Sequence, residues 1–189
     1  MDEREEIDRI CGFLAEGKTI LYPTDTIAGL GCDATSDDAV SKISKLKNRQ
    51  AGKSFIILVS SDAMLNKFVP EIPAIAWDLI DVADKPLTIV YPKGHNLSNL
   101  AVAEDGSVAV RMVKEGFCHR LIQKFGKPIV STSANVQAEN PPQILEQVSP
   151  FIRESVDFIV SAEFWENTNQ SASSILKLNE KGQIKIIRK

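Results

Sequence analysis

Apolar and polar positions recur along the chain in two patterns, one typical of helices and one typical of buried strands. Within residues 3–16, apolar side chains stand at i, i+3, i+4 and i+7 starting from Ile7, the spacing of a helix that packs one face on a core. The run from Phe55 to Val59 is apolar throughout, as expected for a strand covered on both faces. The two patterns predict helices interleaved with buried strands.

The same patterns predict elements over the whole length. Helices are expected over residues 3–16, 37–48, 62–68, 73–83, 115–125 and 141–148, and strands over residues 19–22, 55–59, 87–91, 108–112, 128–132, 158–161, 174–178 and 183–187. Ser36 is the expected N-cap of the second helix, and Pro141-Pro142 the expected start of the last one. A turn at residues 179–182 indicates that the final two strands pair antiparallel. We therefore expect an α/β fold with a mixed sheet, in one domain over residues 1–189.

Composition narrows the class of protein. The 189 residues are 43% hydrophobic and 25% charged, which is typical of a globular domain rather than a disordered or fibrous one. The longest apolar run is far too short to span a membrane, and the N-terminus is acidic with no hydrophobic signal region, so we expect a cytoplasmic protein without membrane association. A net charge of −3 argues against tight binding of duplex nucleic acid through a basic face. The three Cys and two His show no metal-ligand spacing, and no metal site is expected on the chain.

Two short motifs match nucleotide-binding patterns in the wrong context. Residues 12–19 fit G-x-x-x-x-G-K-[ST], but a phosphate loop follows a strand and opens a helix, whereas here a helix comes first and a strand follows. Gly17 is therefore interpreted as the glycine that ends the helix. Residues 29–34 fit G-x-G-x-x-A, yet no acidic residue near position 54 is available to hold a ribose, so a tight turn with close packing is preferred.

Two polar segments carry the candidate chemistry. The first holds five basic residues in twelve positions: Lys42, Lys45, Lys47, Arg49 and Lys53. Spacing alone fits either a solvated helix face or cations that turn inward onto an anionic ligand. In the second segment, Ser131, Ser133 and Asn135 share one side if the backbone is extended, although a plain turn has a similar sequence. Residues 24–26 leave the first strand as a comparable polar loop.

Neither histidine lies in a motif with a nucleophilic Ser or Cys, so covalent catalysis has no support in the sequence. Hydroxyl groups combined with Lys and Arg suit a site that binds phosphates. In phosphoryl or nucleotidyl transfer, positioning and electrostatics supply most of the rate.

Seven short motifs follow one another in order between residues 22 and 188. They are Tyr22-Pro23-Thr24-Asp25-Thr26-Ile27-Ala28-Gly29-Leu30-Gly31, Lys47-x-Arg49, Pro86-Leu87-Thr88, Val110-Arg111, Ser133-Ala134-Asn135, Ser173-Ser174-Ile175 and Ile187-Arg188. Together they resemble the YrdC family of threonylcarbamoyl-AMP synthases. The resemblance implies that family's twisted mixed parallel and antiparallel sheet, with flanking helices around a concave, locally positive groove.

The resemblance further implies that the protein forms threonylcarbamoyl-AMP and pyrophosphate from L-threonine, bicarbonate and ATP, for the t6A modification of tRNA, with Mg²⁺ accompanying ATP. By position in the motifs, ATP would be held by Lys47, Arg49, Lys53, Thr88, Ser133, Asn135 and Arg188, with Lys47 and Arg49 as the catalytic cations. L-Threonine would be held by Thr24, Thr26, Arg111, Ser131 and Ser173, with Arg111 on the carboxylate. Downstream t6A transferase proteins are the implied partners.

The sequence departs from the family pattern at several positions. Ala28 stands where the family usually has an aromatic residue, Ser54 where it has proline, Val113 where its Arg-x-Pro motif ends, and Leu58 where a polar residue is common. Ala28 removes a large pocket wall, a change that bears on the amino-acid substrate rather than on the nucleotide. A divergent paralogue with another amino-acid substrate stays open, and so does a module in which the same cations bind double-stranded RNA or tRNA.

Overall fold

The computed structural model describes residues 2–49, 54–135, 140–165 and 171–189. The strands are β1 (Ile20–Tyr22), β2 (Gly29–Asp33), β3 (Ile56–Val59), β4 (Leu87–Tyr91), β5 (Val108–Met112), β6 (Ile129–Ser133), β7 (Phe158–Ile159), β8 (Ser174–Leu178) and β9 (Ile184–Arg188). The helices are α1 (Glu3–Ala15), α2 (Asp37–Leu46), α3 (Asp62–Phe68), α4 (Ala74–Val82), α5 (Gly116–Phe125) and α6 (Pro150–Ser155), with 3-10 turns at Leu145–Gln147 and Ala162–Phe164. Most predicted elements lie within one or two residues of these bounds.

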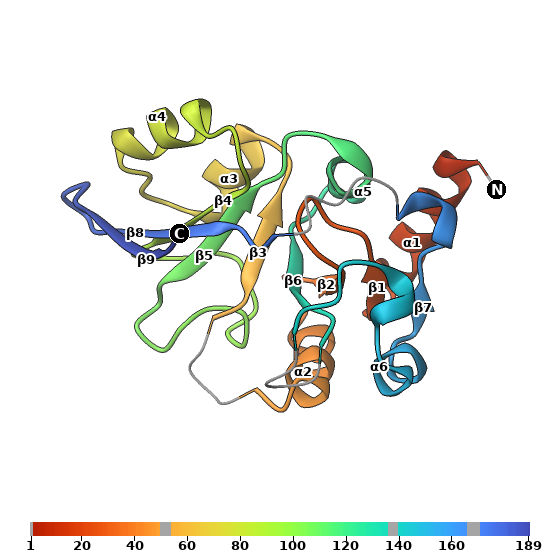
Figure 1. Cartoon of the computed structure of the whole chain (residues 1–189). Coiled ribbons are helices and arrows are strands. Elements are labelled where there is room, and N and C mark those ends of the chain that lie inside the picture. Colours follow the sequence, from red (N-terminus) through yellow and green to blue (C-terminus); the bar gives the residue numbers. More distant parts are fainter. Residues whose placement is uncertain (1, 50–53, 136–139, 166–170) are drawn as a thin grey trace.

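Within the described residues, all nine strands join one sheet in the order β7-β1-β2-β6-β3-β5-β4-β8-β9. The pairs β1–β7, β3–β5 and β4–β8 are parallel. The pairs β1–β2, β2–β6, β3–β6, β4–β5 and β8–β9 are antiparallel. The prediction of a mixed sheet that ends in an antiparallel pair is therefore confirmed. Figure 1 shows α1 and β7 at one end of the molecule and the β8–β9 hairpin at the other.

The first helix ends where its sequence predicts. Gly17 has φ +69°, a left-handed conformation that glycine adopts without strain. Its N–H donates to Leu14 O and the Lys18 N–H donates to Phe13 O, both at 3.0 Å, which is the double hydrogen bond that closes many helix C-termini. Residues 12–19 thus end a helix and enter a strand, and they do not form a phosphate loop.

Strand β2 occupies the glycine-rich stretch, so the expectation of a tight turn there is wrong. The strand pairs with β1 on one side and with β6 on the other, and these two ladders offset the weak strand propensity of glycine. A Cβ atom on Gly31 would lie 2.7 Å from Tyr22 Cε1, and one on Gly29 would lie 3.1 Å from the same atom. The two glycines leave room for the Tyr22 ring on β1, and they form no dinucleotide-binding turn.

The helix predicted over residues 141–148 is also wrong. Pro142 O instead accepts a hydrogen bond from the Ala28 N–H at 3.0 Å, which pins this segment beside the loop between β1 and β2. The helix of this region is α6, which starts at Pro150 behind the N-cap Ser149, whose hydroxyl accepts from Ile152 N. Proline at the first helical position is the correct signal, but it belongs to Pro150 rather than to Pro141.

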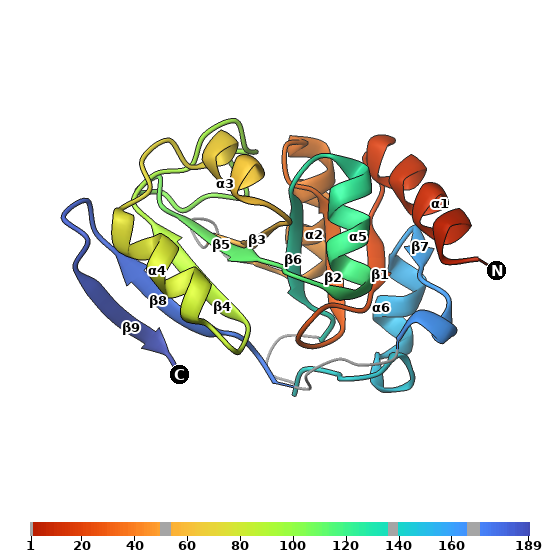
Figure 2. The same ribbon diagram turned by 90° about the horizontal axis from the view of Figure 1, so that it is seen from above.

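Helices cover the sheet unequally on its two faces. One apolar cluster packs α2, α3 and α4 against one face, through side chains that include Val40, Leu65 and Ile80. A second cluster packs α1 and α5, which lie side by side in Figure 2, against Tyr22 and Leu58 on the opposite face. In the described part of the chain, no helix has the length and apolarity needed to cross a membrane.

Candidate functional site

A cavity of about 380 Å³ lies on the α5 face of the sheet, beside the area that α1 and α5 cover. Its floor follows from strand register. Ile56 on β3 pairs with Ala109 on β5 and with Ser131 on β6, and Ala109 pairs with Val90 on β4. Paired residues point to the same face, so four neighbouring strands supply one surface that is apolar in its middle and bears hydroxyl groups at its β6 edge.

The end of α2 divides the basic run into residues on the helix, such as Lys42, and residues beyond it, such as Lys47 and Arg49. Asn48 has φ +44°, a left-handed conformation that asparagine tolerates. Its N–H donates to Lys45 O and the Arg49 N–H donates to Ser44 O, both at 3.0 Å. The turn directs the residues after Leu46 away from the helix axis. Lys42 stays on the helix, donates to Gly17 O at 2.9 Å and does not line the cavity.

Lys47 joins the end of α2 to the end of β6. Its ammonium donates to Ser133 O at 2.9 Å, to Asn135 Oδ1 at 3.0 Å, and to Asn135 O. The Ser133 hydroxyl donates to the same Asn135 Oδ1 at 2.5 Å. The two polar segments identified in the sequence therefore meet, and the cation of the first lies against the carbonyl groups of the second.

Arg49 lies at the wall of the cavity. Its guanidinium carbon is 4.4 Å from the centre of the Phe55 ring, a cation–π distance, and its Nη2 donates to Ser54 O. Burial lowers the pKa of Arg49, although an arginine side chain stays protonated at neutral pH. Ser54 and Phe55, just before β3, thus hold a partly desolvated cation beside the floor of the cavity.

Among the described cations of the site, Arg111 is the most deeply buried. It pairs with Leu58 on β3 and Thr88 on β4, and its side chain is only 4% exposed. Its Nη2 donates to Asp25 Oδ1 at 2.7 Å. Asp25 lies within the polar loop that the sequence indicated, but nothing in the sequence identified it as the partner of Arg111, because the two residues are 86 positions apart.

The loop that carries Asp25 is held by Thr24. Thr24 Oγ1 accepts from the N–H groups of Thr26 at 3.1 Å and Ile27 at 3.2 Å, donates to Ile27 O at 2.8 Å, and lies 2.9 Å from Thr26 Oγ1. Thr24 and Thr26 both line the cavity. Thr24 therefore uses its hydroxyl to shape the turn, a common use of threonine in loops, and Thr26 lies beside it at the cavity wall.

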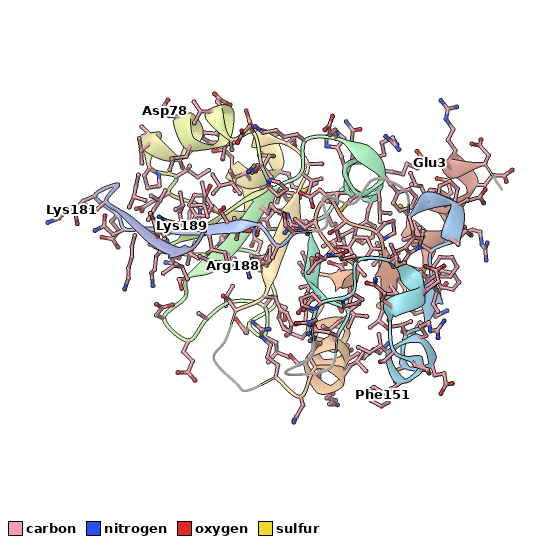
Figure 3. The ribbon with its side chains drawn as sticks, in the orientation of Figure 1. Glu3, Asp78, Phe151, Lys181, Arg188 and Lys189 are labelled. Carbon is pink, nitrogen blue, oxygen red and sulfur yellow. The ribbon has the colours of Figure 1, made fainter. Side chains whose placement is uncertain are left out.

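The opposite wall comes from the segment before β8 and from β9. Ser173 and Arg188 both line the cavity. The Nε and Nη2 groups of Arg188 donate to Ser173 O at 2.9 and 2.7 Å, and burial followed by the charge of Arg111 lowers the pKa of Arg188. Figure 3 shows Arg188 toward the middle of the molecule, whereas Lys181 lies at the outer tip of the β8–β9 hairpin.

The remaining predicted site residues lie in different places. Thr88 is fully buried and does not line the cavity. Its hydroxyl lies 2.7 Å from Ser173 Oγ, so it supports Ser173 from behind. Ser131 lines the cavity floor, and Lys53 falls outside the described residues. Ala28 lines the cavity as well, with its backbone bound to Pro142 and Ala134.

A second cavity of about 450 Å³ lies beyond the Asp25 loop and shares Thr24 with the first. Its described walls include Glu3, Glu115 and Glu163, and Arg120 there is bound to Glu3 at 2.7 Å or less. Carboxylate groups repel phosphates. The smaller cavity, with its arginines, is therefore the candidate site for an anionic ligand.

Comparison with known proteins identifies the family of the chain and its fold. The sequence model of the Sua5/YciO/YrdC family, described as telomere recombination, matches residues 12–189. The chain belongs to the Sua5/YciO/YrdC family. The mixed sheet and its flanking helices are the fold of solved members of this family, among them P. abyssi Sua5 and the E. coli protein YciO.

Three relatives illustrate the similarity within the Sua5/YciO/YrdC family. The threonylcarbamoyl-AMP synthase of Pseudoalteromonas translucida is 30% identical over 90% of this chain and 93% of its own length. The threonylcarbamoyl-AMP synthase of Blochmanniella pennsylvanica is 36% identical over 71% of each chain. P. abyssi Sua5, solved in complex with L-threonine, superposes with a TM-score of 0.87 at 27% identity, and this chain covers 54% of its length.

Proposed function

We propose that this protein is an L-threonylcarbamoyladenylate synthase, which forms threonylcarbamoyl-AMP and pyrophosphate from L-threonine, bicarbonate and ATP. The observation that carries the proposal is that Arg49, Arg111 and Arg188, from three distant parts of the chain, line one cavity together with Thr26, Ser131 and Ser173. Relatives named threonylcarbamoyl-AMP synthase support the choice of reaction.

The reaction requires a site that gathers several anions. The threonine amine adds to the carbon of bicarbonate-derived carbon dioxide and loses a proton, which gives a carbamate. A carbamate oxygen then attacks the α-phosphorus of ATP, and the bond from that phosphorus to the bridging oxygen breaks to release pyrophosphate. Negative charge collects on the phosphate oxygens during this displacement, and fixed cations in a partly dry cavity stabilise it.

The positions of the cations suggest a division of roles. Arg49 and Arg188 lie at the walls of the cavity and would bind the triphosphate, with Lys47 at the adjacent end of β6. A guanidinium presents parallel N–H groups that match phosphate or carboxylate oxygens. Arg111, which is deepest, would bind the threonine carboxylate, and the apolar floor at Ile56 and Ala109 would lie under the less polar parts of the ligands.

The remaining polar residues would complete the two subsites. Thr26, Ser131 and Ser173 would contact L-threonine, with Thr24 shaping the loop. Ser133 and Asn135 would complete the nucleotide side, Thr88 would act through Ser173, and Lys53 would add a further cation.

We also propose that magnesium arrives with the nucleotide. Among the described residues, no three His, Cys, Asp or Glu side chains are grouped so that they can hold a metal ion. Mg²⁺ retains several waters and commonly binds through substrate phosphates. The metal would then neutralise part of the triphosphate charge, and the arginines would neutralise the rest.

The expected partners are L-threonine, bicarbonate and ATP inside the cavity, and the t6A transferase proteins that consume the product. A cytoplasmic location and weak binding of tRNA or double-stranded RNA remain predictions. Burial of Arg111 and the inward hydrogen bonds of Lys47 favour small anions over an RNA backbone, because RNA-binding cations need to reach phosphates at the surface.

The proposal is tested by incubating the purified protein with ¹⁴C-bicarbonate, L-threonine and Mg-ATP, then separating the nucleotide products. We expect a labelled adenylate that disappears when threonine or ATP is omitted. Arg49→Ala is expected to lower its rate of formation at least tenfold, whereas Arg153→Ala, which removes an exposed arginine on α6, is expected to leave the rate unchanged. No labelled adenylate from the wild type would refute the proposal, and labelling with another amino acid in place of threonine would indicate the paralogue.

A further inference from the structure

One carboxylate contacts the cationic site from the side of the β1–β2 loop. Asp25 accepts a hydrogen bond from Arg111 Nη2 at 2.7 Å, and the two side chains are 19% and 4% exposed. A carboxylate weakens the attraction of a cavity for anions, so its position against the deepest arginine needs a physical reason.

The surroundings of Arg111 supply that reason. A guanidinium this deeply buried is costly unless hydrogen bonds and a counter-charge compensate. Arg188 and Arg111 lie close enough for their charges to interact, since the charge of Arg111 contributes to the lowered pKa of Arg188. Arg111 Nε is buried and has no acceptor among the described residues. Among the described residues, the hydrogen bond to Asp25 therefore holds this guanidinium at one of its three nitrogens.

The position of Asp25 is itself well defined. Its two neighbours belong to the turn in which Thr24 Oγ1 makes hydrogen bonds to Thr26 and Ile27. Gly29, the first residue of β2, comes so close to this turn that a Cβ on it would lie 2.7 Å from Thr24 Cγ2. The carboxylate is thus held by a packed and hydrogen-bonded loop rather than by a mobile one.

We propose that Asp25 is a positioning residue for amino-acid binding: it holds Arg111 by one N–H group, so that the remaining N–H groups of the guanidinium are available to the carboxylate of the amino-acid substrate. The inference rests on the proposed function, in which Arg111 binds that carboxylate. Asp25 acts through Arg111, and it does not contact the reacting atoms.

The test compares L-threonine with threoninol, the amino alcohol that has a hydroxymethyl group in place of the carboxylate. Dissociation constants of both are measured calorimetrically, with ATP present and bicarbonate removed, for the wild type, Asp25→Ala and Asp25→Asn. The alanine variant is expected to bind L-threonine at least tenfold more weakly and threoninol and ATP within twofold of the wild type. The asparagine variant keeps an acceptor for Nη2, so its loss is expected to be smaller.

Asp33→Asn serves as the matched control, because Asp33 is also a buried carboxylate in a 2.7 Å ion pair, with Lys127, outside the cavity. It is expected to lower thermal stability without changing the preference for L-threonine over threoninol. If Asp25→Ala does not fold, Asp25→Asn carries the test, and its preference for L-threonine over threoninol is expected to fall at least threefold.

Three results would overturn the inference: unchanged L-threonine binding in the Asp25 variants, equal losses for L-threonine and threoninol, or tighter binding of L-threonine. The last would mean that Asp25 competes with the substrate. Because the readout is binding rather than turnover, threonine binding without adenylate formation would refute the proposed function and still allow this test. A wild type that binds no L-threonine would refute both.

Discussion

Gly29→Ala tests how closely the site loop is packed on the sheet. A Cβ atom at this position would lie 2.7 Å from Thr24 Cγ2, 3.1 Å from Tyr22 Cε1 and 3.4 Å from Ser131 Oγ. Carbon atoms in contact normally lie about 3.5–4.0 Å apart, so the Thr24 methyl group has to move by nearly 1 Å. The turn around Thr24 is hydrogen-bonded in place, and the movement would shift Asp25 and Thr26 with it.

The size of the effect follows from the cost of overpacking. Extra methyl groups in a packed interior typically cost about 1–3 kcal/mol, and 1 kcal/mol shifts the Tm of a domain of this size by about 2–4 °C. We therefore expect Gly29→Ala to lower the Tm by about 2–12 °C and to weaken L-threonine binding more than ATP binding. Differential scanning calorimetry and titration calorimetry measure the two effects.

Gly12→Ala is the matched control, because it is the same substitution at an open position. Gly12 lies inside α1, and a Cβ there would have no atom within 4 Å. Alanine is a better helix former than glycine by about 0.5–1 kcal/mol, so this variant is expected to gain stability and to keep wild-type ligand binding. Equal stability of Gly29→Ala and the wild type would refute the packing argument.

Two further predictions concern charge. Lys47→Met removes an ammonium that binds Ser133 and Asn135, so we expect ATP binding to fall at least tenfold and stability to fall by about 1–3 kcal/mol, whereas Lys181→Met at the hairpin tip changes neither. Burial, with a contribution from Asp8, raises the pKa of Cys11 to about 11, so roughly one thousandth of this thiol is ionised at pH 8. We expect iodoacetamide to label it slowly at pH 8 and faster toward pH 11, and labelling at the rate of the unfolded chain would contradict the structure.

The sequence predicted those elements whose stability is local. Capping by Ser36 and the left-handed Gly17 lie where the pattern indicated, since caps and apolar stripes depend on neighbours a few residues away. Strand β2 was missed because its conformation depends on pairing with β1 and β6, and because Gly29 and Gly31 leave space for the ring of Tyr22. The residues next to these glycines in the sequence do not indicate that a ring from another strand packs against them.

The site divides in the same way. The basic run after α2 and the hydroxyl groups after β6 are visible in the sequence, and the ammonium of Lys47 brings them together. Arg111, Ser173 and Arg188 carry no local signal, and only their resemblance to family motifs pointed to them. Their proximity is set by the β5–β4–β8–β9 ladder. Asp25 was not assigned a role because its partner is chosen by the fold.

A crystal structure with a non-hydrolysable ATP analogue and L-threonine would show whether one cavity holds both ligands. We expect the triphosphate within hydrogen-bonding distance of Arg49 and Arg188, and the threonine carboxylate on Arg111 in the same cavity. Ligands bound instead in the acidic cavity beyond the Asp25 loop, or a triphosphate that contacts none of these arginines, would contradict it.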